Sequence, residues 1–250
     1  MTPVVLTALG VGGATVIGAV IGFIFKRLSH SVSDIIMSFA SGVMLAAAVL
    51  GLVLPSLEYG GKYGLIITVV GIFVGAFCLS LMDKLVPHLH RLAGVDEEHL
   101  ADQKASKVML FVIAIAIHNL PEGIAAGVGF GTGNISDAMM IALGIALQNI
   151  PEGMIIITPL ISTGVKPGRA LLIAAFTGLF EVIGTFLGYC AVSISSVVLP
   201  FALAFAAGTM LYVVSDEMVP ETHSHGHQRA ATYALLIGFC LMLVFDVLLG

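Results

Sequence analysis

Charged residues are scarce in this chain. Asp, Glu, Lys and Arg together make up 10% of its 250 residues, against about a quarter in a typical soluble domain. Hydrophobic residues make up 58%, and the mean hydropathy is +1.09. This composition excludes an ordinary soluble domain and predicts that a lipid bilayer surrounds the protein. The few basic residues form no patch for a phosphate backbone, so we expect no nucleic-acid partner.

Cysteine is rarer still, and each copy stands alone in an apolar stretch: Cys78, Cys190 and Cys240. Their spacing excludes a cysteine-based zinc site or a redox pair. No His-Glu-x-x-His stretch occurs, which disfavours a membrane-embedded metallohydrolase. We therefore expect no enzyme and no catalytic cofactor.

Eight long apolar segments fill most of the sequence. A helix crosses the hydrocarbon of a bilayer in about 20 apolar residues, whereas the strands of a membrane barrel alternate over about ten. These segments are near-continuous apolar runs, so we predict an all-α integral membrane protein with one transmembrane domain over residues 1–250. The predicted spans are 4–25, 33–55, 63–85, 107–129, 137–161, 168–191, 197–218 and 229–249.

The positions of the basic residues predict the orientation. Cytoplasmic loops of membrane proteins are enriched in Lys and Arg. With the N-terminus outside the cell, Lys62 is outside and the other nine of the ten basic residues are inside. We therefore expect a protein of the cytoplasmic membrane with both termini outside. The polar segment 86–107 and the histidine-containing segment 219–228 then become cytoplasmic loops.

Two similar hexads occur in the fourth and fifth predicted spans: His118-Asn119-Leu120-Pro121-Glu122-Gly123 and Gln148-Asn149-Ile150-Pro151-Glu152-Gly153. The two spans run in opposite directions. Inverted repeats with interrupted helices are typical of secondary transporters, in which they build a site near the bilayer midplane. Each proline leaves a helix carbonyl without its usual partner, beside an asparagine, which adds oxygen atoms at this depth.

Ionisable side chains lie at the same depth. His118 and Glu122 are four residues apart on one helix face, Glu152 has the matching position in the next span, and Glu181 is central in the sixth. Carboxylates this close together cannot all stay charged without compensation. A bound divalent cation provides it, and imidazole with carboxylate suits zinc, iron or manganese. Protonation, with a proton-relay or structural hydrogen-bond role, is the alternative.

Further candidates lie around this level. Met44 is near the middle of the second span, as a thioether ligand or as core packing. Acids at the cytoplasmic span ends are either part of an exit path or solvated helix ends: Asp83, Asp216 and Glu217. The loop histidines indicate weak metal capture or plain loop polarity: His223, His225 and His227.

The two hexads resemble the paired motifs of the Zrt/Irt-like (ZIP) metal transporters, and the prokaryotic GufA-like branch in particular. The resemblance extends over essentially the whole chain. It implies a homodimer that imports Zn²⁺, or Cd²⁺, Fe²⁺, Mn²⁺ or Co²⁺, by alternating access through a binuclear site. A proton-coupled cation exchanger or a channel is the alternative.

The resemblance also implies the ligands of both ions. The first ion would bind Met44, His118, Glu122, Gln148 and Glu152. The second would bind Asn119, Glu122, Asn149, Glu152 and Glu181. The family often has an acid at the position of Asn149, so the second ion would meet one negative charge fewer in this chain. The resemblance also includes the cytoplasmic release region of the family, which would comprise Asp216, Glu217, His223, His225 and His227.

Overall fold

The computed structural model describes residues 1–25, 28–92, 100–162 and 164–249. Within these ranges the chain forms helices and no strand, which confirms the predicted all-α fold. The helices are α1 (Thr2–Phe25), α2 (His30–Ala46), α3 (Leu54–Tyr59), α4 (Gly64–Leu92), α5 (Leu100–Val128), α6 (Ile135–Ser162), α7 (Pro167–Ile194), α8 (Leu199–Val213), α9 (Val219–Thr222) and α10 (Gln228–Leu249). Two π-helical segments, Ala47–Val53 and Val214–Met218, join α2 to α3 and α8 to α9.

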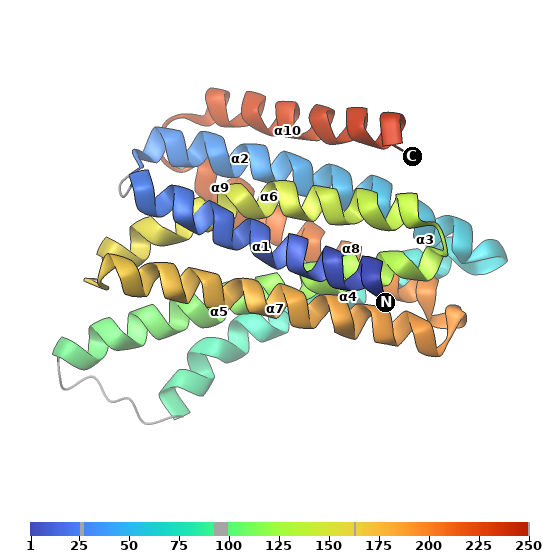
Figure 1. The fold of residues 1–250 in the computed structure, drawn as a ribbon, viewed down its shortest axis with the longest axis horizontal. Coiled ribbons are helices and arrows are strands. Elements are labelled where there is room, and N and C mark those ends of the chain that lie inside the picture. Colours follow the sequence, from blue (N-terminus) through green and yellow to red (C-terminus); the bar gives the residue numbers. More distant parts are fainter. Residues whose placement is uncertain (26–27, 93–99, 163, 250) are drawn as a thin grey trace.

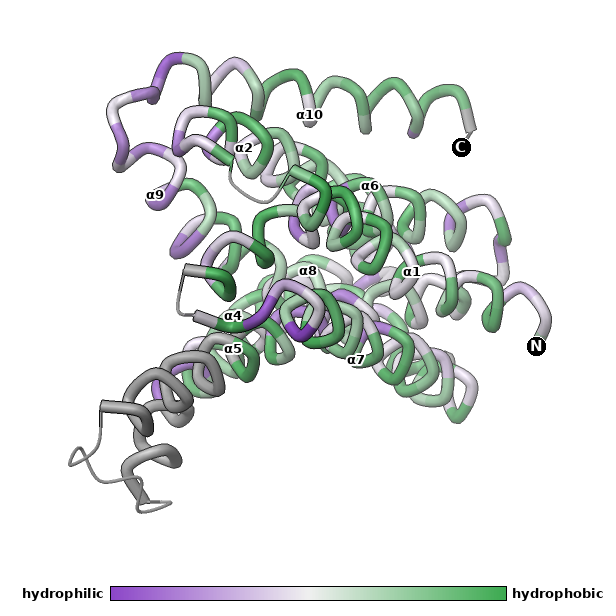
Figure 2. The backbone as a smooth tube through the Cα atoms, turned by 60° about the vertical axis from the view of Figure 1, so that its left-hand side comes forward, coloured by the Kyte–Doolittle hydropathy of each residue, from purple (hydrophilic) through white to green (hydrophobic). Residues whose placement is uncertain are grey.

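Seven helices among the described residues are long and apolar enough to cross a membrane, and α5, with 29 residues, is the eighth long helix. The second crossing helix runs without a break through α2 and α3, from His30 to Tyr59, and the seventh from Leu199 to Thr222. In Figure 2 these helices are hydrophobic along most of their length, and hydrophilic residues gather where α9 ends and α10 begins.

The helices extend beyond several predicted spans. Helix α4 continues to Leu92, and α5 already begins at Leu100. Much of the predicted loop 86–107 is therefore helical. Residues 93–99 of that loop lie outside the described residues. In the predicted loop 219–228, the short helix α9 occupies the first four residues. Hydropathy marks where a chain leaves the apolar layer, but polar residues can continue the same helix into water.

The helix ends follow local chemistry. The Ser29 side chain accepts a hydrogen bond from the Val32 N–H and caps α2. Prolines stand in the first turn of α7 and α8, where no hydrogen bond is lost. The turn between α9 and α10 contains Gly226 with φ of 89°, a backbone conformation that favours glycine.

The packing of the helices follows an inverted repeat. The closest neighbours are α1 with α6, α5 with α7, α2 with α10, and α4 with α8. If the first three spans are exchanged with the last three, and the fourth with the fifth, these pairs map onto one another. Both π-helical segments lie in the exchanged second and seventh spans. Both termini lie at one end of the molecule (Figure 1).

A repeated segment brings the hexads close to their neighbours. The pattern Val-Ile-Gly-x-x-x-Gly occurs in α1 at 16–22 and in α7 at 182–188. Gly18 packs against the backbone of Ile150, and Gly184 against that of Leu120. These two contacts are equivalent in the repeat, since each places a glycine against the third residue of a hexad. Without a side chain at these glycines, the helix backbones can approach closely.

Candidate metal site

The two hexads face α1 and α7 through their own glycines. Gly123 of α5 packs against the backbone of Glu181, and Gly153 of α6 packs against that of Thr15. Thr15 and Glu181 are also equivalent in the repeat, because each directly precedes a Val-Ile-Gly-x-x-x-Gly segment. The polar residues of both hexads therefore meet one hydroxyl and one carboxylate between α1 and α7.

The Glu181 carboxylate accepts three hydrogen bonds in this place. Thr15 Oγ1 donates to Oε1 at 2.5 Å, Asn119 Nδ2 donates to Oε1 at 2.9 Å, and Asn149 Nδ2 donates to Oε2 at 2.5 Å. Asn149 Nδ2 also lies 3.2 Å from the carbonyl oxygen of Val11, which accepts from it. All four polar residues are buried. These donors compensate a carboxylate that has no access to water.

Asn119 and Asn149 both donate hydrogen bonds to Glu181 through Nδ2, and their Oδ1 atoms remain without a partner. In the two hexads, the buried oxygens without a hydrogen-bond partner are Asn119 Oδ1, Glu122 Oε2, Gln148 Oε1 and Asn149 Oδ1. Gln148 Nε2 has no such partner either. An unsatisfied buried polar atom costs about 1–3 kcal/mol. The carboxylate and amide chemistry of these oxygens fits a divalent metal.

His118 contacts two acids outside this group of oxygens. Its Nε2 lies 3.0 Å from Glu217 Oε1 and 3.6 Å from Asp83 Oδ1. In the described part of the chain, this is the one trio of His, Cys, Asp or Glu ligand atoms that all lie within 4.8 Å of one another. The structure thus places His118 with two acids that we predicted on an exit path, and not in such a trio with Glu122 or Glu152.

A cavity of about 800 Å³ connects these residues with one end of the molecule. Met44, His118, Glu122 and Glu152 line it, together with Asp216 and Glu217. Asp34 and His225 line it as well. Met44 is ten residues further along the second crossing helix than Asp34, which is about 15 Å of helix. The cavity therefore runs from the end of the molecule where α2 begins to the level of the hexads.

The eight predicted metal ligands fall into two groups. Those that line the cavity are Met44, His118, Glu122 and Glu152. Those that do not are Asn119, Gln148, Asn149 and Glu181, and all of these are buried. In the first hexad the division follows the helix faces, because His118 and Glu122 are four residues apart and share a face, whereas Asn119 turns to Glu181 of α7. In the second hexad Gln148 and Glu152 also share a face, but only Glu152 lines the cavity.

The structure separates the three loop histidines. The Nδ1 of His223 lies 2.9 Å from the Val219 carbonyl oxygen and 3.2 Å from Thr222 Oγ1, and its Nε2 lies 3.1 Å from Thr232 Oγ1. The rings of His225 and His227 instead face Asp34 of α2. Asp34 was missed by our reading of the sequence. An acid near the start of an otherwise apolar span was the available signal.

Fold and site together define a helical membrane protein with buried side chains of the types that bind metals, some of which line a cavity. A family model described as "ZIP Zinc transporter" matches residues 90–246. The chain belongs to the ZIP zinc transporter family, which confirms the resemblance of the two hexads. The family model describes transporters and not an enzyme, in agreement with the absence of an enzyme motif.

Relatives match along nearly the whole chain. The chain is 36% identical to the zinc transporter GufA of Myxococcus xanthus, over 98% of both chains. It is also 36% identical to the zinc transporter ZupT of Chlorobaculum parvum, over 93% of this chain and 92% of the relative. The zinc transporter ZIPB of Bordetella bronchiseptica is 36% identical over 95% of this chain and 78% of its own length.

Proposed function

We propose that this protein imports a divalent transition-metal ion, Zn²⁺ above all, into the cytoplasm. The buried oxygens of Asn119, Glu122, Gln148 and Asn149, which have no hydrogen-bond partner, are the observation that carries the proposal. The three relatives described above are all named as zinc transporters, which supports Zn²⁺ as the transported ion. Cd²⁺, Fe²⁺, Mn²⁺ and Co²⁺ prefer similar ligands and are further candidates.

The principal ion would bind Met44, His118, Glu122, Gln148 and Glu152. In this structure the His118 imidazole lies near Glu217 and Asp83. To become a ligand of this ion, it would have to turn toward Glu122. We propose that this rotation passes the ion on. The imidazole leaves the buried carboxylates together with the ion and brings it toward the acids 83 and 217, which lie 3.6 and 3.0 Å from its Nε2.

The second ion of a binuclear site would compete with existing hydrogen bonds. Asn119 and Asn149 donate to both oxygens of Glu181, so an ion between these three residues would have to displace two donors. Both amides would also have to turn their oxygens toward the ion. Since the family often has an acid in place of Asn149, we propose that the second ion binds more weakly here than the first, with Glu122 and Glu152 as shared ligands.

We propose that the end at which the cavity opens faces the cytoplasm. The basic residues Lys166, Arg169 and Arg229 lie next to helix ends at that side, as expected for cytoplasmic loops. Open from that end, the structure corresponds to the releasing state of an alternating-access cycle. The opposite state would arise if the spans with the hexads shift against the remaining helices.

We also propose a homodimer in the cytoplasmic membrane, with both termini outside. The outer face of α4 supports a protein or lipid contact, since its large apolar side chains are exposed: Leu65, Ile66, Phe73 and Phe77. Cross-linking through single cysteines on this face, in membranes, would test the dimer. The same cross-link yield from cysteines on the outer face of α4 and from cysteines on another face would contradict the dimer.

Uptake of radioactive zinc into proteoliposomes tests the function. Wild type should show saturable uptake, whereas Glu122→Gln and Glu152→Gln should lose more than about tenfold, because a buried charged ligand is missing. Glu58→Gln is the matched control, since Glu58 is exposed on α3 at the other end. Equal uptake by all four proteins would disprove transport through the hexads. If an imposed proton gradient changes the rate of zinc uptake, the protein is a proton-coupled exchanger. If the rate rises linearly with zinc concentration, the protein is a channel.

A further inference from the structure

We propose that the cavity is also a binding site for a linear aliphatic polyamine. The ammonium groups of this ligand would pair with carboxylates along the cavity, and its methylene groups would lie on the apolar wall. Bound in this way, the ligand lies across the route of the metal ion. That it enters from the cytoplasm and holds back metal release rests on the proposed function. The binding site itself is defined by the cavity, whatever the direction of transport.

The charge of the cavity is of one sign. Among the described residues that line it, none is Lys or Arg. The acids that line it are Asp34, Glu122, Glu152, Asp216, Glu217 and Glu221. A cavity lined by charges of one sign attracts and concentrates ions of the opposite sign. The ligand that fits best therefore carries several positive charges.

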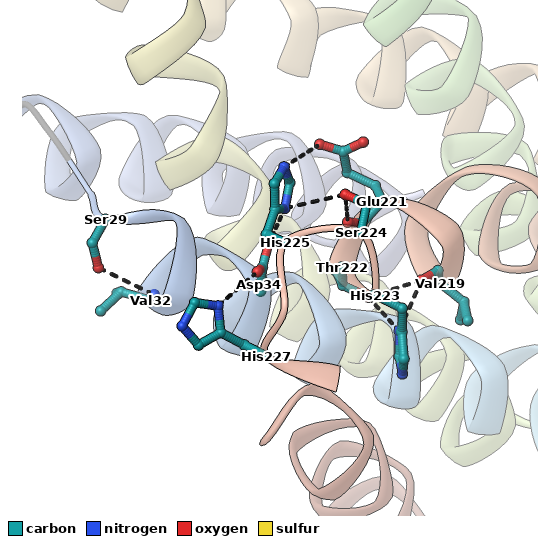
Figure 3. Close-up of polar contacts among 10 residues, drawn as sticks. All are labelled: Ser29, Val32, Asp34, Val219, Glu221, Thr222, His223, Ser224, His225 and His227. Atoms are coloured by element: carbon teal, nitrogen blue, oxygen red, sulfur yellow. Dashed lines mark hydrogen bonds and ion pairs between the residues drawn. The ribbon is translucent and has the colours of Figure 1, made fainter. Parts of the chain in front are cut away.

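Two of these acids have a buried oxygen without a hydrogen-bond partner, at opposite ends of the cavity. Glu122 Oε2 lies at the level of the hexads, and Asp34 Oδ2 lies near the open end. The two residues are 3% and 4% exposed. Figure 3 shows the ring of His225 between Asp34 and Glu221 at this end. A buried carboxylate needs a compensating partner, and one long ligand with a cationic group at each end would provide it for both.

Between these ends the acids follow one another at intervals of about one helical turn. Glu217 Oε1 lies 3.0 Å from Nε2 of His118, which is four residues from Glu122 on α5, about 6 Å of helix. Glu221 is four residues beyond Glu217 toward the open end, about 6 Å further. A polyamine has ammonium groups at regular intervals along its chain. The series of acids matches that pattern better than it matches a single compact cation.

Apolar side chains line the cavity between the levels of the acids. Met37 lies between Asp34 and Met44 on the second crossing helix, and Ile155 follows Glu152 by three residues toward the open end. Further apolar residues of the wall are Ile115, Ile156, Pro159 and Val213. The isoleucines offer no ligand to a metal ion, whereas methylene groups bury apolar surface against them. The volume of about 800 Å³ is in the range of small-molecule sites.

Isothermal titration calorimetry with spermine tests the site in the purified full-length protein, in detergent and without zinc. We expect one equivalent to bind. Putrescine, with two ammonium groups on a shorter chain, should bind at least about tenfold more weakly, because it reaches fewer of the carboxylates. Asp34→Asn and Glu122→Gln should each weaken spermine binding by about tenfold or more. Met37→Gln keeps the length of the side chain but places an amide on the apolar wall, so it should weaken binding by a smaller factor.

Glu58→Gln is the matched control, because it also changes an acid to an amide but lies at the other end of the molecule. It should bind spermine as wild type does. Thermal unfolding checks each variant, and if Asp34→Asn does not fold, Glu122→Gln and Met37→Gln decide. No binding to wild type would disprove the site. Equal affinities for spermine and putrescine, or for all variants, would show only a general attraction of polycations to an acidic protein. Because binding is measured without transport, this result is independent of the uptake assay.

Discussion

Thr15 and Glu181 occupy equivalent positions in the inverted repeat and are hydrogen-bonded to each other, Oγ1 to Oε1, at 2.5 Å. The repeat is therefore symmetric in its backbone but not in its charge. Two acids at these positions would face each other in a site without water and raise the energy of both. A hydroxyl on one side lets the other side carry the acid, which then also receives the two asparagines of the hexads.

This contact predicts the effect of Thr15→Val. The substitution keeps the shape and removes one of the donors to a buried carboxylate, so we expect a loss of about 1–3 kcal/mol of stability. Thermal unfolding in detergent measures it. Thr177→Val is the control, because the Thr177 hydroxyl only donates to a carbonyl of its own helix, Ala174 O. Equal melting temperatures for the two variants would contradict the importance of the Thr15 donor.

Asn149→Asp should make the protein depend on metal. The substitution removes the donor at 2.5 Å from Glu181 Oε2 and places a second carboxylate beside the first. We expect the metal-free variant to lose about 3–5 kcal/mol, as for other buried charges without a partner. Zinc should raise its melting temperature more than that of wild type, because the new acid would be a further ligand of the proposed site. A metal-free variant as stable as wild type would contradict the hydrogen-bond network described for Glu181.

Close packing of α1 on α6 predicts a difference between two glycines of the same helix. A Cβ at Gly18 would collide with the backbone of Ile150, whereas one at Gly13 would meet nothing within 4 Å. We expect Gly18→Ala to destabilise the protein by about 1–3 kcal/mol. Gly13→Ala should be neutral or stabilise by up to about 1 kcal/mol, since alanine favours helix. Thermal unfolding of both variants, prepared in parallel, decides, and the same loss in both would contradict the packing.

The position of His118 predicts a change in rate rather than affinity for Glu217→Gln. The substitution removes the charge whose Oε1 lies 3.0 Å from the imidazole, and leaves Glu122 and Glu152 untouched. A loss of about 1.4 kcal/mol from this contact corresponds to a rate about tenfold lower. The maximal rate of zinc uptake should therefore fall by that factor, while the half-saturating zinc concentration stays similar. Asp216→Asn, at the neighbouring position, should lose less. An unchanged rate with weaker half-saturation would place Glu217 in the binding site instead.

Most of the architecture could be predicted from the sequence. The long apolar segments required membrane helices, and the match of 118–123 with 148–153 placed the polar residues on two adjacent spans. The resemblance of these hexads to the ZIP family is confirmed by the family model and by the relatives. The helix ends differ from the ends of the predicted spans, because hydropathy reports the apolar layer and α4 extends beyond it to Leu92.

The sequence by itself determined the class of the protein and the residue types at the centre of the bundle, because only helices satisfy their backbone groups inside a bilayer. The tertiary structure decided how those residues are used. Asn119 and Asn149 turn to Glu181, His118 turns to Asp83 and Glu217, and His225 and His227 turn to Asp34. The physical reason is that a side chain finds its partner on another helix, and spacing along one helix cannot reveal which helix lies opposite.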